Sequence, residues 1–254
     1  MLTPPPPIPH NSLVNHNRFT VTIKAQAPMT TLSQEHSAVV NAHTMYRKNV
    51  HNIATYKHKV LKPSTNKKLG KRVTKGRYAG FPLYTLTLEE RATCPRACEH
   101  WADCYGNNMP FGHRFETEGL MPRLELELDA LDKRHPTGYL VRLHVLGDFY
   151  SVSYVEFWAE QLRERPALAV YGYSRNHPGE TVIGDALADA RGELGFSRFS
   201  IRFSTLPTDT LSANTEHNAG KDGIVCPVQL DKTDSCGTCA LCWTAFKPIT
   251  FLDH

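Results

Sequence analysis

The chain has 254 residues, of which 41% are hydrophobic and 21% charged, and its formal net charge is +4. That length can bury a substantial core in one or two domains, and the composition is that of an ordinary soluble globular protein. No stretch approaches the roughly 18 uninterrupted apolar residues of a membrane span. Residues 1–9 lack the charged-then-apolar order of a secretory signal, so we predict a cytoplasmic protein.

Charge is distributed unevenly along the chain. Between His36 and Leu88 there is no Asp or Glu, but there are eleven basic residues. These are Arg47, Lys48, Lys57, Lys59, Lys62, Lys67, Lys68, Lys71, Arg72, Lys75 and Arg77. From Glu89 onward there are 24 acidic against 16 basic residues. The basic stretch, residues 47–77, either binds a phosphate-bearing partner such as nucleic acid or is covered by the acidic body or by solvent.

Composition divides the chain into four expected parts. They are a disordered leader (1–35), a basic arm (36–80), an α/β core that carries the first cysteine loop (81–210) and a cysteine-rich C-terminal lobe (211–254). The leader contains four consecutive prolines and a polar sequel, which favours disorder, and Met29 within it is a candidate natural start. The arm shows only a weak helical pattern, around residues 37–56.

From residue 83 onward, strand-like and helix-like segments alternate. Expected strands are 83–88, 139–146, 167–173 and 198–203, and expected helices are 115–134, 153–165 and 181–192. Short connections between alternating elements predict parallel βαβ units. The result is an α/β fold with either an open doubly wound sheet or part of a barrel. In both, functional groups gather at the carboxyl ends of the strands.

All seven cysteines lie in two clusters. The N-terminal cysteine set is Cys94, Cys98 and Cys104, with spacing Cys-x3-Cys-x5-Cys-Tyr directly after the first expected strand. In a reducing compartment, clustered cysteines are interpreted as metal ligands in preference to disulfides. Three thiolates can hold an iron–sulfur cluster with one iron position open for a substrate or cofactor. With His100 as a fourth ligand, the set would instead be a structural zinc site.

The C-terminal cysteine set is Cys226, Cys236, Cys239 and Cys242, with spacing Cys-x9-Cys-x2-Cys-x2-Cys. Four thiolates suffice for a closed site with a structural or electron-relay role. The overlapping Cys-x2-Cys spacing favours a cubane iron–sulfur cluster, and zinc is the alternative.

Two polar residues stand in expected strands. His144 is predicted to be a satisfied core histidine rather than a ligand. Arg202 would point inward if Ile201 and Phe203 pack outward, and an inward arginine could bind a carboxylate or a phosphate.

The N-terminal cysteine set, together with Gly147-Asp148 at the end of the second strand, resembles the radical S-adenosylmethionine (SAM) superfamily. The resemblance implies a partial parallel (βα) barrel and a 4Fe–4S cluster on this set, with SAM bound at the fourth iron. It also implies that Gly147, Asp148 and Tyr105 contact the cofactor. The gap before the last cysteine is five residues here, whereas the superfamily usually has two.

A narrower resemblance comes from the segments CPRACEHWADCYGN, RLHVLGDFYS and CPVQLDKTDSCGTCALCW, with NKKLGK upstream. They are similar to the phage and mobile-element gene product 88 family over roughly residues 62–254. This resemblance implies a phage or prophage origin, and hence a bacterial host cytoplasm, but no particular reaction.

The leading functional prediction is therefore a radical-SAM-like iron–sulfur enzyme with an open iron site. The first alternative is a non-catalytic zinc or iron–sulfur protein that contacts nucleic acid through its basic arm. A second alternative is an electron carrier or redox sensor without SAM.

Overall fold

The centre of the molecule is a five-stranded sheet in the order β2-β3-β5-β6-β7. The computed structural model describes residues 29–215 and 223–252, so most of the predicted leader, residues 1–28, lies outside the described residues. The strands are β2 (Lys62–Pro63), β3 (Leu83–Thr85), β5 (Tyr139–Leu143), β6 (Leu168–Ser174) and β7 (Phe199–Phe203). Strands β3, β5, β6 and β7 run parallel, and β2 adds an antiparallel edge.

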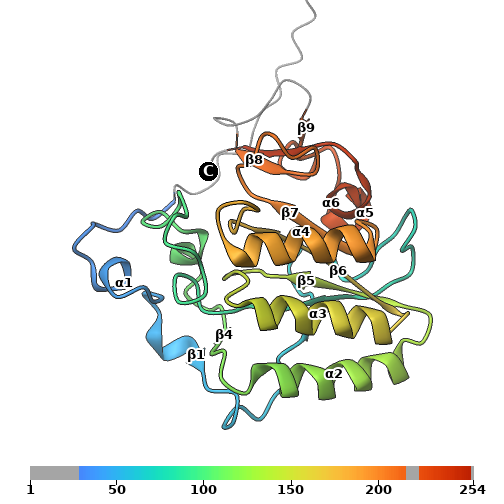
Figure 1. Ribbon diagram of the computed structural model, residues 1–254, viewed down its shortest axis with the longest axis horizontal. Coiled ribbons are helices and arrows are strands. Elements are labelled where there is room, and N and C mark those ends of the chain that lie inside the picture. Colours follow the sequence, from blue (N-terminus) through green and yellow to red (C-terminus); the bar gives the residue numbers. More distant parts are fainter. Residues whose placement is uncertain (1–28, 216–222, 253–254) are drawn as a thin grey trace, which may run out of the picture.

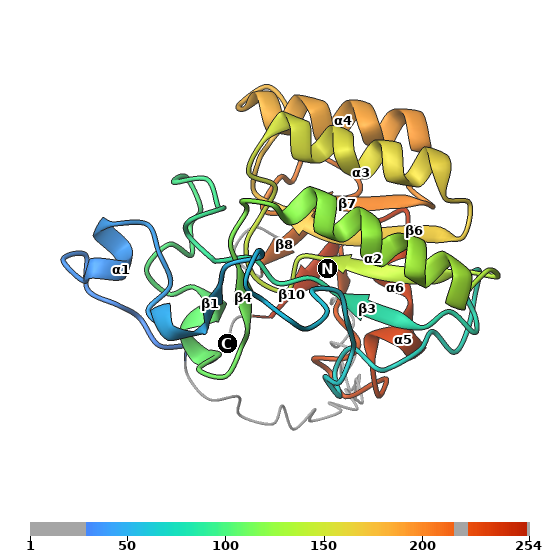
Figure 2. The same cartoon turned by 90° about the horizontal axis from the view of Figure 1, so that it is seen from below.

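Three helices connect the parallel strands and cover one face of the sheet (Figures 1 and 2). They are α2 (Leu120–Arg134), α3 (Val152–Glu164) and α4 (Val182–Leu194). Helix α3 begins where Ser151 Oγ accepts a hydrogen bond from the Tyr154 amide, and α4 begins where Thr181 accepts from the Gly184 amide. Helix α2 follows Gly119, whose φ of +69° turns the chain into the helix. The apolar faces of these helices build the larger core against the sheet.

The opposite face of the sheet is covered by the C-terminal lobe and by the loop of residues 66–80. The lobe contains two short helices, α5 (Cys236–Cys239) and α6 (Leu241–Thr244). A second, smaller core joins these parts. It contains Val73 and Tyr78 from the loop, Leu140 and Tyr171 from the sheet, and Ala240, Cys242 and Trp243 from the lobe. The sheet therefore separates a helical layer from a layer that carries the C-terminal cysteine set.

Smaller elements flank this arrangement. Strands β8 (Ala213–Thr215), β10 (Ile249–Phe251) and β9 (Ile224–Val225) form a three-stranded parallel sheet in the lobe. Strands β1 (Val50–His51) and β4 (Arg114–Phe115) pair beside the N-terminal segment, which also holds α1 (Ser37–Val40) and the 3-10 turn η1 (Arg47–Asn49). A second 3-10 turn, η2 (Tyr105–Asn108), follows the first cysteines.

The alternation of parallel strands and helices predicted from the sequence is confirmed, but the barrel is not. Strand order follows chain order and the three crossover helices share one face, as they would along part of a βα barrel. No closed barrel is found among the described residues, because β2 and β7 are the two edges of an open sheet. Among the same residues, no helix has the length and apolarity that crossing a membrane would need.

Candidate metal centres

The N-terminal cysteine set lies in the loop after β3, at the carboxyl ends of the parallel strands, as the sequence predicts. Glu99 in this loop forms an ion pair of 2.9 Å with Arg175, which follows β6. The same carboxylate accepts from Thr205 Oγ1, beyond β7, at 3.3 Å. Thr93, next to Cys94, accepts a hydrogen bond of 3.2 Å from the Asp148 amide, beyond β5. The loop is thus tied to the ends of three neighbouring strands.

Buried polar residues hold this loop from beneath. Arg91 donates to the Trp101 carbonyl at 2.7 Å and to Asn107 Oδ1 at 2.7 Å. Glu90 and Arg114 form an ion pair of 2.6 Å with side chains that are 1% and 0% exposed. Arg114 also donates to the Gly106 carbonyl at 3.0 Å, so the pair supports η2 directly behind Cys104.

The three thiols of the N-terminal set are free and lie within electrostatic reach of one another. Burial raises the pKa of Cys94, and the charges of Asp148, Cys98 and Cys104 raise it further. Burial likewise raises the pKa of Cys98 to about 12, with smaller contributions from Cys104 and Asp148. The three thiols lie in the one loop between β3 and η2. His100 is exposed and pairs with Asp103 at 3.4 Å.

Gly147 and Asp148 stand beside this loop, but their contacts are with the chain itself. Gly147 has φ of +84°, and a Cβ there would lie 2.6 Å from both Leu88 Cβ and Thr93 Oγ1. The Asp148 carboxylate accepts three hydrogen bonds of 2.7 Å, from the Phe149 amide, Ser174 Oγ and the Arg175 amide. Burial raises the pKa of Asp148 to about 6. Both residues therefore join the cysteine loop to the strand ends.

Tyr105, the third residue predicted to contact a cofactor, begins η2 and is 44% exposed. Its position beside Cys104 follows from the Cys-Tyr motif. Cys104 Sγ accepts a hydrogen bond of 3.4 Å from the Gly106 amide and so caps the turn that carries Tyr105.

The C-terminal cysteine set lies in the C-terminal lobe, on the face of the sheet opposite the three helices. Cys226 follows β9, Cys236 and Cys239 are the ends of α5, and Cys242 lies in α6. The Ser235 side chain caps α5 by accepting from the Thr238 amide at 3.2 Å. Ala240, with φ of +62°, turns the chain from α5 into α6 and brings Cys242 back toward the sheet.

All four thiols of this set are free. Burial raises the pKa of Cys236 to about 12, and Cys242, Cys226 and Cys239 each raise it further. Burial also raises the pKa of Cys242, with further increases from Cys226 and Cys239, while a hydrogen bond from Tyr173 and the charge of Arg202 lower it. The Tyr173 hydroxyl lies 2.9 Å from Cys242 Sγ.

Both sets contain the thiol groups that a metal–thiolate centre needs, but their side chains are not placed as they would be around a bound metal. Within residues 29–215 and 223–252, no group of three or more His, Cys, Asp or Glu side chains is arranged to hold a metal ion. Thiolates are the ligands that zinc and iron–sulfur clusters share, and cysteine side chains change position by rotating about a single bond. Loading would therefore draw the sulfurs of each set together.

Two arginines lie near the C-terminal set, and the sequence predicted the orientation of one of them only. Arg202 points inward as predicted, but its donors go to main-chain carbonyls of the lobe rather than to an open ligand site. Arg142, in β5, lies near Cys236 and Cys242, and the sequence interpretation missed it. The visible signal was a charged residue in the otherwise apolar segment Tyr139–Leu143.

His144 is a core residue, as predicted, but its hydrogen bonding is incomplete, because Nδ1 is buried without a partner among the described residues. It is 5% exposed, stacks on Tyr154 and lies 3.0 Å from the Tyr154 hydroxyl through Nε2. Burial and the charge of Arg142 lower the pKa of His144 to about 3. The ring is therefore neutral at physiological pH and belongs to the packing of α3 against the sheet.

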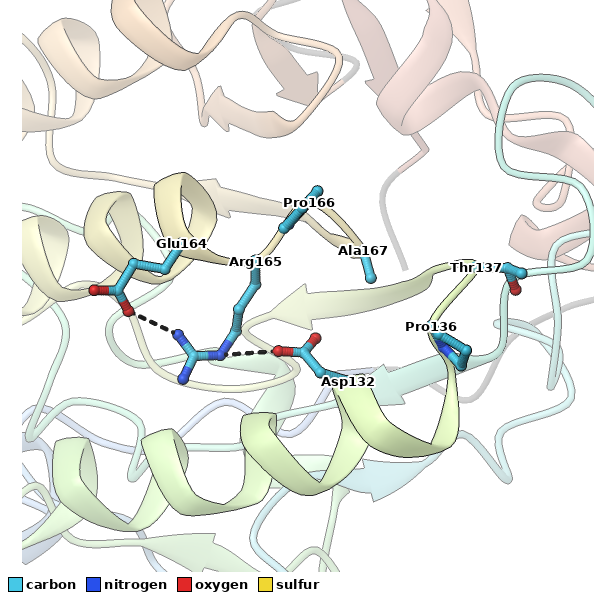
Figure 3. A pocket seen from close by; sticks show the side chains of 7 residues that line it. All are labelled: Asp132, Pro136, Thr137, Glu164, Arg165, Pro166 and Ala167. Carbon is cyan, nitrogen blue, oxygen red and sulfur yellow. Dashed lines mark hydrogen bonds and ion pairs between the residues drawn. The ribbon is translucent and has the colours of Figure 1, made fainter.

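A surface pocket of about 360 Å³ lies away from both cysteine sets (Figure 3). It is lined by Asp132, Pro136, Thr137, Glu164, Arg165, Pro166 and Ala167. Arg165 is held by Asp129 at 2.6 Å, Asp132 at 3.2 Å and Glu164 at 3.1 Å. The pocket lies where α2 and α3 end and β5 and β6 begin, at the amino-terminal ends of the parallel strands. Residues at this end of a parallel βα fold usually contribute to stability rather than to function.

Comparison with known proteins gives one match. A family model described as gene product 88 matches residues 58–189, which is more than half of the chain. The matched span runs from the segment before β2 into α4. It includes the N-terminal cysteine set and Asp148 and ends before the C-terminal set. Neither a curated protein nor a solved structure matches the chain.

Proposed function

Because the chain belongs to the gene product 88 family and its seven free cysteines fall into two sets, we propose that it is a metal–thiolate protein of phage or prophage origin. The N-terminal set holds a 4Fe–4S cluster, and the C-terminal set holds a second cluster or a zinc ion. The observation that carries this proposal is the grouping of the seven free thiols, three in the loop after β3 and four in the C-terminal lobe. Clustered thiols that form no disulfide suit a shared metal.

The N-terminal set is proposed to leave one coordination position open. It supplies three thiols, and His100, the candidate fourth ligand, is exposed and engaged with Asp103. A 4Fe–4S cluster bound there would supply electron transfer and an iron position for a small molecule. The chain's own contribution is to fix the loop through Arg91 and Asn107 and to bring it against the strand ends through Thr93.

SAM is the ligand that the sequence resemblance suggests for the open position, and a radical-SAM-like enzyme is the enzymatic form of the proposal. The three hydrogen bonds that Asp148 accepts from its own chain support a positioning role for this carboxylate. An incoming ammonium group would have to use its remaining lone pairs.

Anaerobic reconstitution followed by iron and sulfide analysis tests the proposal. We expect about eight irons per chain if both sets hold cubanes and about four if the C-terminal set holds zinc. Cys98→Ser should remove about four irons, because it deletes one of three ligands. Ala97→Ser, an exposed neighbour in the same loop, is the matched control and should change nothing. Zinc without sulfide in the wild-type protein would contradict an iron–sulfur function.

Calorimetry on the same loaded protein then tests the enzymatic form. Binding of SAM by the wild-type protein, lost in Cys98→Ser, would support it. A loaded protein that shows no SAM binding would exclude this ligand and leave the metal–thiolate proposal standing.

A second candidate function, contact with nucleic acid, is favoured by the position of the basic loop. Lys67, Lys71 and Lys75 are exposed on the loop of residues 66–80. This loop is fixed to the C-terminal lobe by main-chain hydrogen bonds, from Cys236 to Lys68 at 2.7 Å, from Gly237 to Leu69 at 2.9 Å and from Thr74 to Gly237 at 3.0 Å. A cationic surface held in one conformation loses little entropy on meeting a phosphate backbone.

Replacing Lys71 and Lys75 with glutamine tests this candidate. Each phosphate contact contributes about −0.9 to the slope of log affinity against log salt for duplex DNA, so the double variant should flatten the slope by up to about 2. The control Lys133→Gln, Arg163→Gln removes the same charge from exposed positions on α2 and α3. Equal slopes in wild-type, test and control proteins would rule out this loop as the contact.

A further inference from the structure

Arg202 is a buried cation that forms no ion pair with a carboxylate of the described residues. The carboxylate that acts on it electrostatically, Asp209, is itself paired with Arg191 at 2.9 Å. The Arg202 side chain lies on β7 facing the lobe, and the residue is 0% exposed. It donates to the carbonyls of Cys242 at 2.8 Å, Ala245 at 2.6 Å and Lys247 at 3.0 Å. These carbonyls satisfy its N–H groups but carry no net charge, and burial lowers the pKa of Arg202 accordingly. A buried charge of this kind needs a counter-charge nearby.

Arg142 is a second cation on the same face of the sheet. The residue is half-buried, and its Nε is shielded from solvent without a hydrogen-bond partner among the described residues. Its guanidinium carbon lies 5.9 Å from the centre of the Tyr173 ring. The groups that act on it electrostatically are Tyr171, Tyr173, Cys236 and Cys242. It forms no ion pair with any carboxylate of the described residues.

Two further donors beside the C-terminal set lack acceptors. The Tyr171 hydroxyl and Trp243 Nε1 are both buried and unpaired within the described part of the chain. Their rings pack together with centres 4.7 Å apart. Buried N–H and O–H groups are normally paired, so an unpaired cluster of them calls for an acceptor. Among the described residues, the anionic groups that act on Arg142 are the Cys236 and Cys242 sulfurs and the Tyr171 and Tyr173 hydroxyls, and Cys242 also acts on Arg202.

The charge of a tetrathiolate centre matches these cations. Four thiolates around a divalent ion, or around a cubane core of the same charge, leave a net charge of about −2. Thiolate sulfurs and cluster sulfides also accept hydrogen bonds from N–H and O–H groups, which tune the centre.

We infer that the C-terminal cysteine set binds a dianionic tetrathiolate centre for which Arg142 and Arg202 are the counter-cations. This inference rests on the proposed function. It adds the charge of the centre and the residues that balance it. Arg202 is committed to the lobe backbone, so Arg142 is the cation whose role is separable from folding.

Arg142→Met is expected to weaken metal binding without lowering the stability of the metal-free protein, a combination that loss of a purely structural residue would not give. Arg142 forms no ion pair with a carboxylate of the described residues, so removing its charge should leave the thermal stability of the metal-free protein unchanged or raised. The same change should weaken Zn²⁺ binding roughly ten- to a hundredfold, as loss of a group outside the ligand shell commonly does. A structural arginine would lower both quantities together.

The measurement is a Zn²⁺ titration of full-length protein against a competing chelator, in a Cys94→Ser, Cys98→Ser background so that only the C-terminal set titrates. Arg163→Met, an exposed arginine on α3, is the charge-matched control and should bind Zn²⁺ like the parent. Arg142→Lys keeps the charge and should recover most of the affinity.

Parental affinity in Arg142→Met would overturn the inference while leaving the metal site intact. A fall in both apo stability and affinity, without recovery in Arg142→Lys, would also overturn it. Absence of Zn²⁺ binding by the parent would overturn both the inference and the proposed C-terminal site.

Discussion

Arg114→Met is expected to lower the free energy of unfolding by about 3–5 kcal/mol, the usual effect of breaking a buried ion pair from one side. Arg114 and Glu90 are 2.6 Å apart and almost fully enclosed. Glu90 also accepts from Thr44 Oγ1 at 2.6 Å, so its carboxylate joins the N-terminal segment to the cysteine loop. Without the guanidinium, a buried carboxylate would be left uncompensated.

Urea denaturation measures this effect, and two variants define it. Arg163→Met breaks an ion pair whose partners are 50% and 54% exposed, so its expected loss is at most about 1 kcal/mol. Adding Glu90→Gln to Arg114→Met removes the orphaned charge and should restore part of the stability. Equal losses in Arg114→Met and Arg163→Met would show that the buried pair carries no special weight.

The same variant links stability to the N-terminal cysteine set. A Cβ on Gly106 would lie 2.6 Å from Glu90 Oε1, so the carboxylate packs tightly against η2. Loosening this contact should reduce cluster retention even where the fold survives. Iron content measured after dilution at a temperature where the variant stays folded would report it.

The parallel core was predictable because its signals are strong and local. Apolar runs separated by amphipathic segments mark β5, β6 and β7. Helix α3 was expected to begin at Ser153, and the residue that caps it is Ser151. Observed bounds for α4, Val182–Leu194, lie within two residues of the expected 181–192. Helix α2 begins at Leu120 rather than 115, because Gly119 adopts a left-handed conformation that ends the preceding loop.

The two- and three-residue strands carried no such signal. Strand β9 is Ile224–Val225 and pairs with β10 from the other end of the lobe, a contact that only tertiary structure defines. Strand–helix alternation left an open sheet and part of a barrel as alternatives, the resemblance favoured the barrel, and the open sheet order does not confirm it. Whether a parallel sheet closes depends on pairing between its edges, which strand periodicity does not encode.

For the candidate sites, cysteine spacing predicted two sets of thiols, and the structure places one in the loop after β3 and the other in the C-terminal lobe. That each set shares a metal stays a prediction. Spacing could not reveal how Asp148 is used, because a carboxylate after a strand looks the same whether it awaits a ligand or binds Ser174. Nor could it reveal that the basic loop lies on α5, since the two segments are far apart in the sequence.

The packing of the basic loop on α5 should make both segments depend on the C-terminal cysteine set. Cys239→Ser, or removal of the metal with a chelator, is expected to release both the lobe and the basic loop. Metal-binding energy is folding energy in small metal-held units. The amides of Thr74, Cys236 and Gly237 are bonded across the interface between loop and lobe, so their hydrogen exchange should accelerate on the order of a hundredfold or more.

Hydrogen exchange followed by mass spectrometry resolves this release from general unfolding. Peptides from α3 and α4 should keep their protection, because the helical layer packs on the opposite face of the sheet (Figure 2). Thr238→Ser retains every sulfur in α5 and should exchange like the wild type. Unchanged exchange in residues 68–74 after metal removal would mean that the lobe folds without metal. If the loop is released, nucleic-acid affinity should fall with it, because the cations would lose their fixed arrangement.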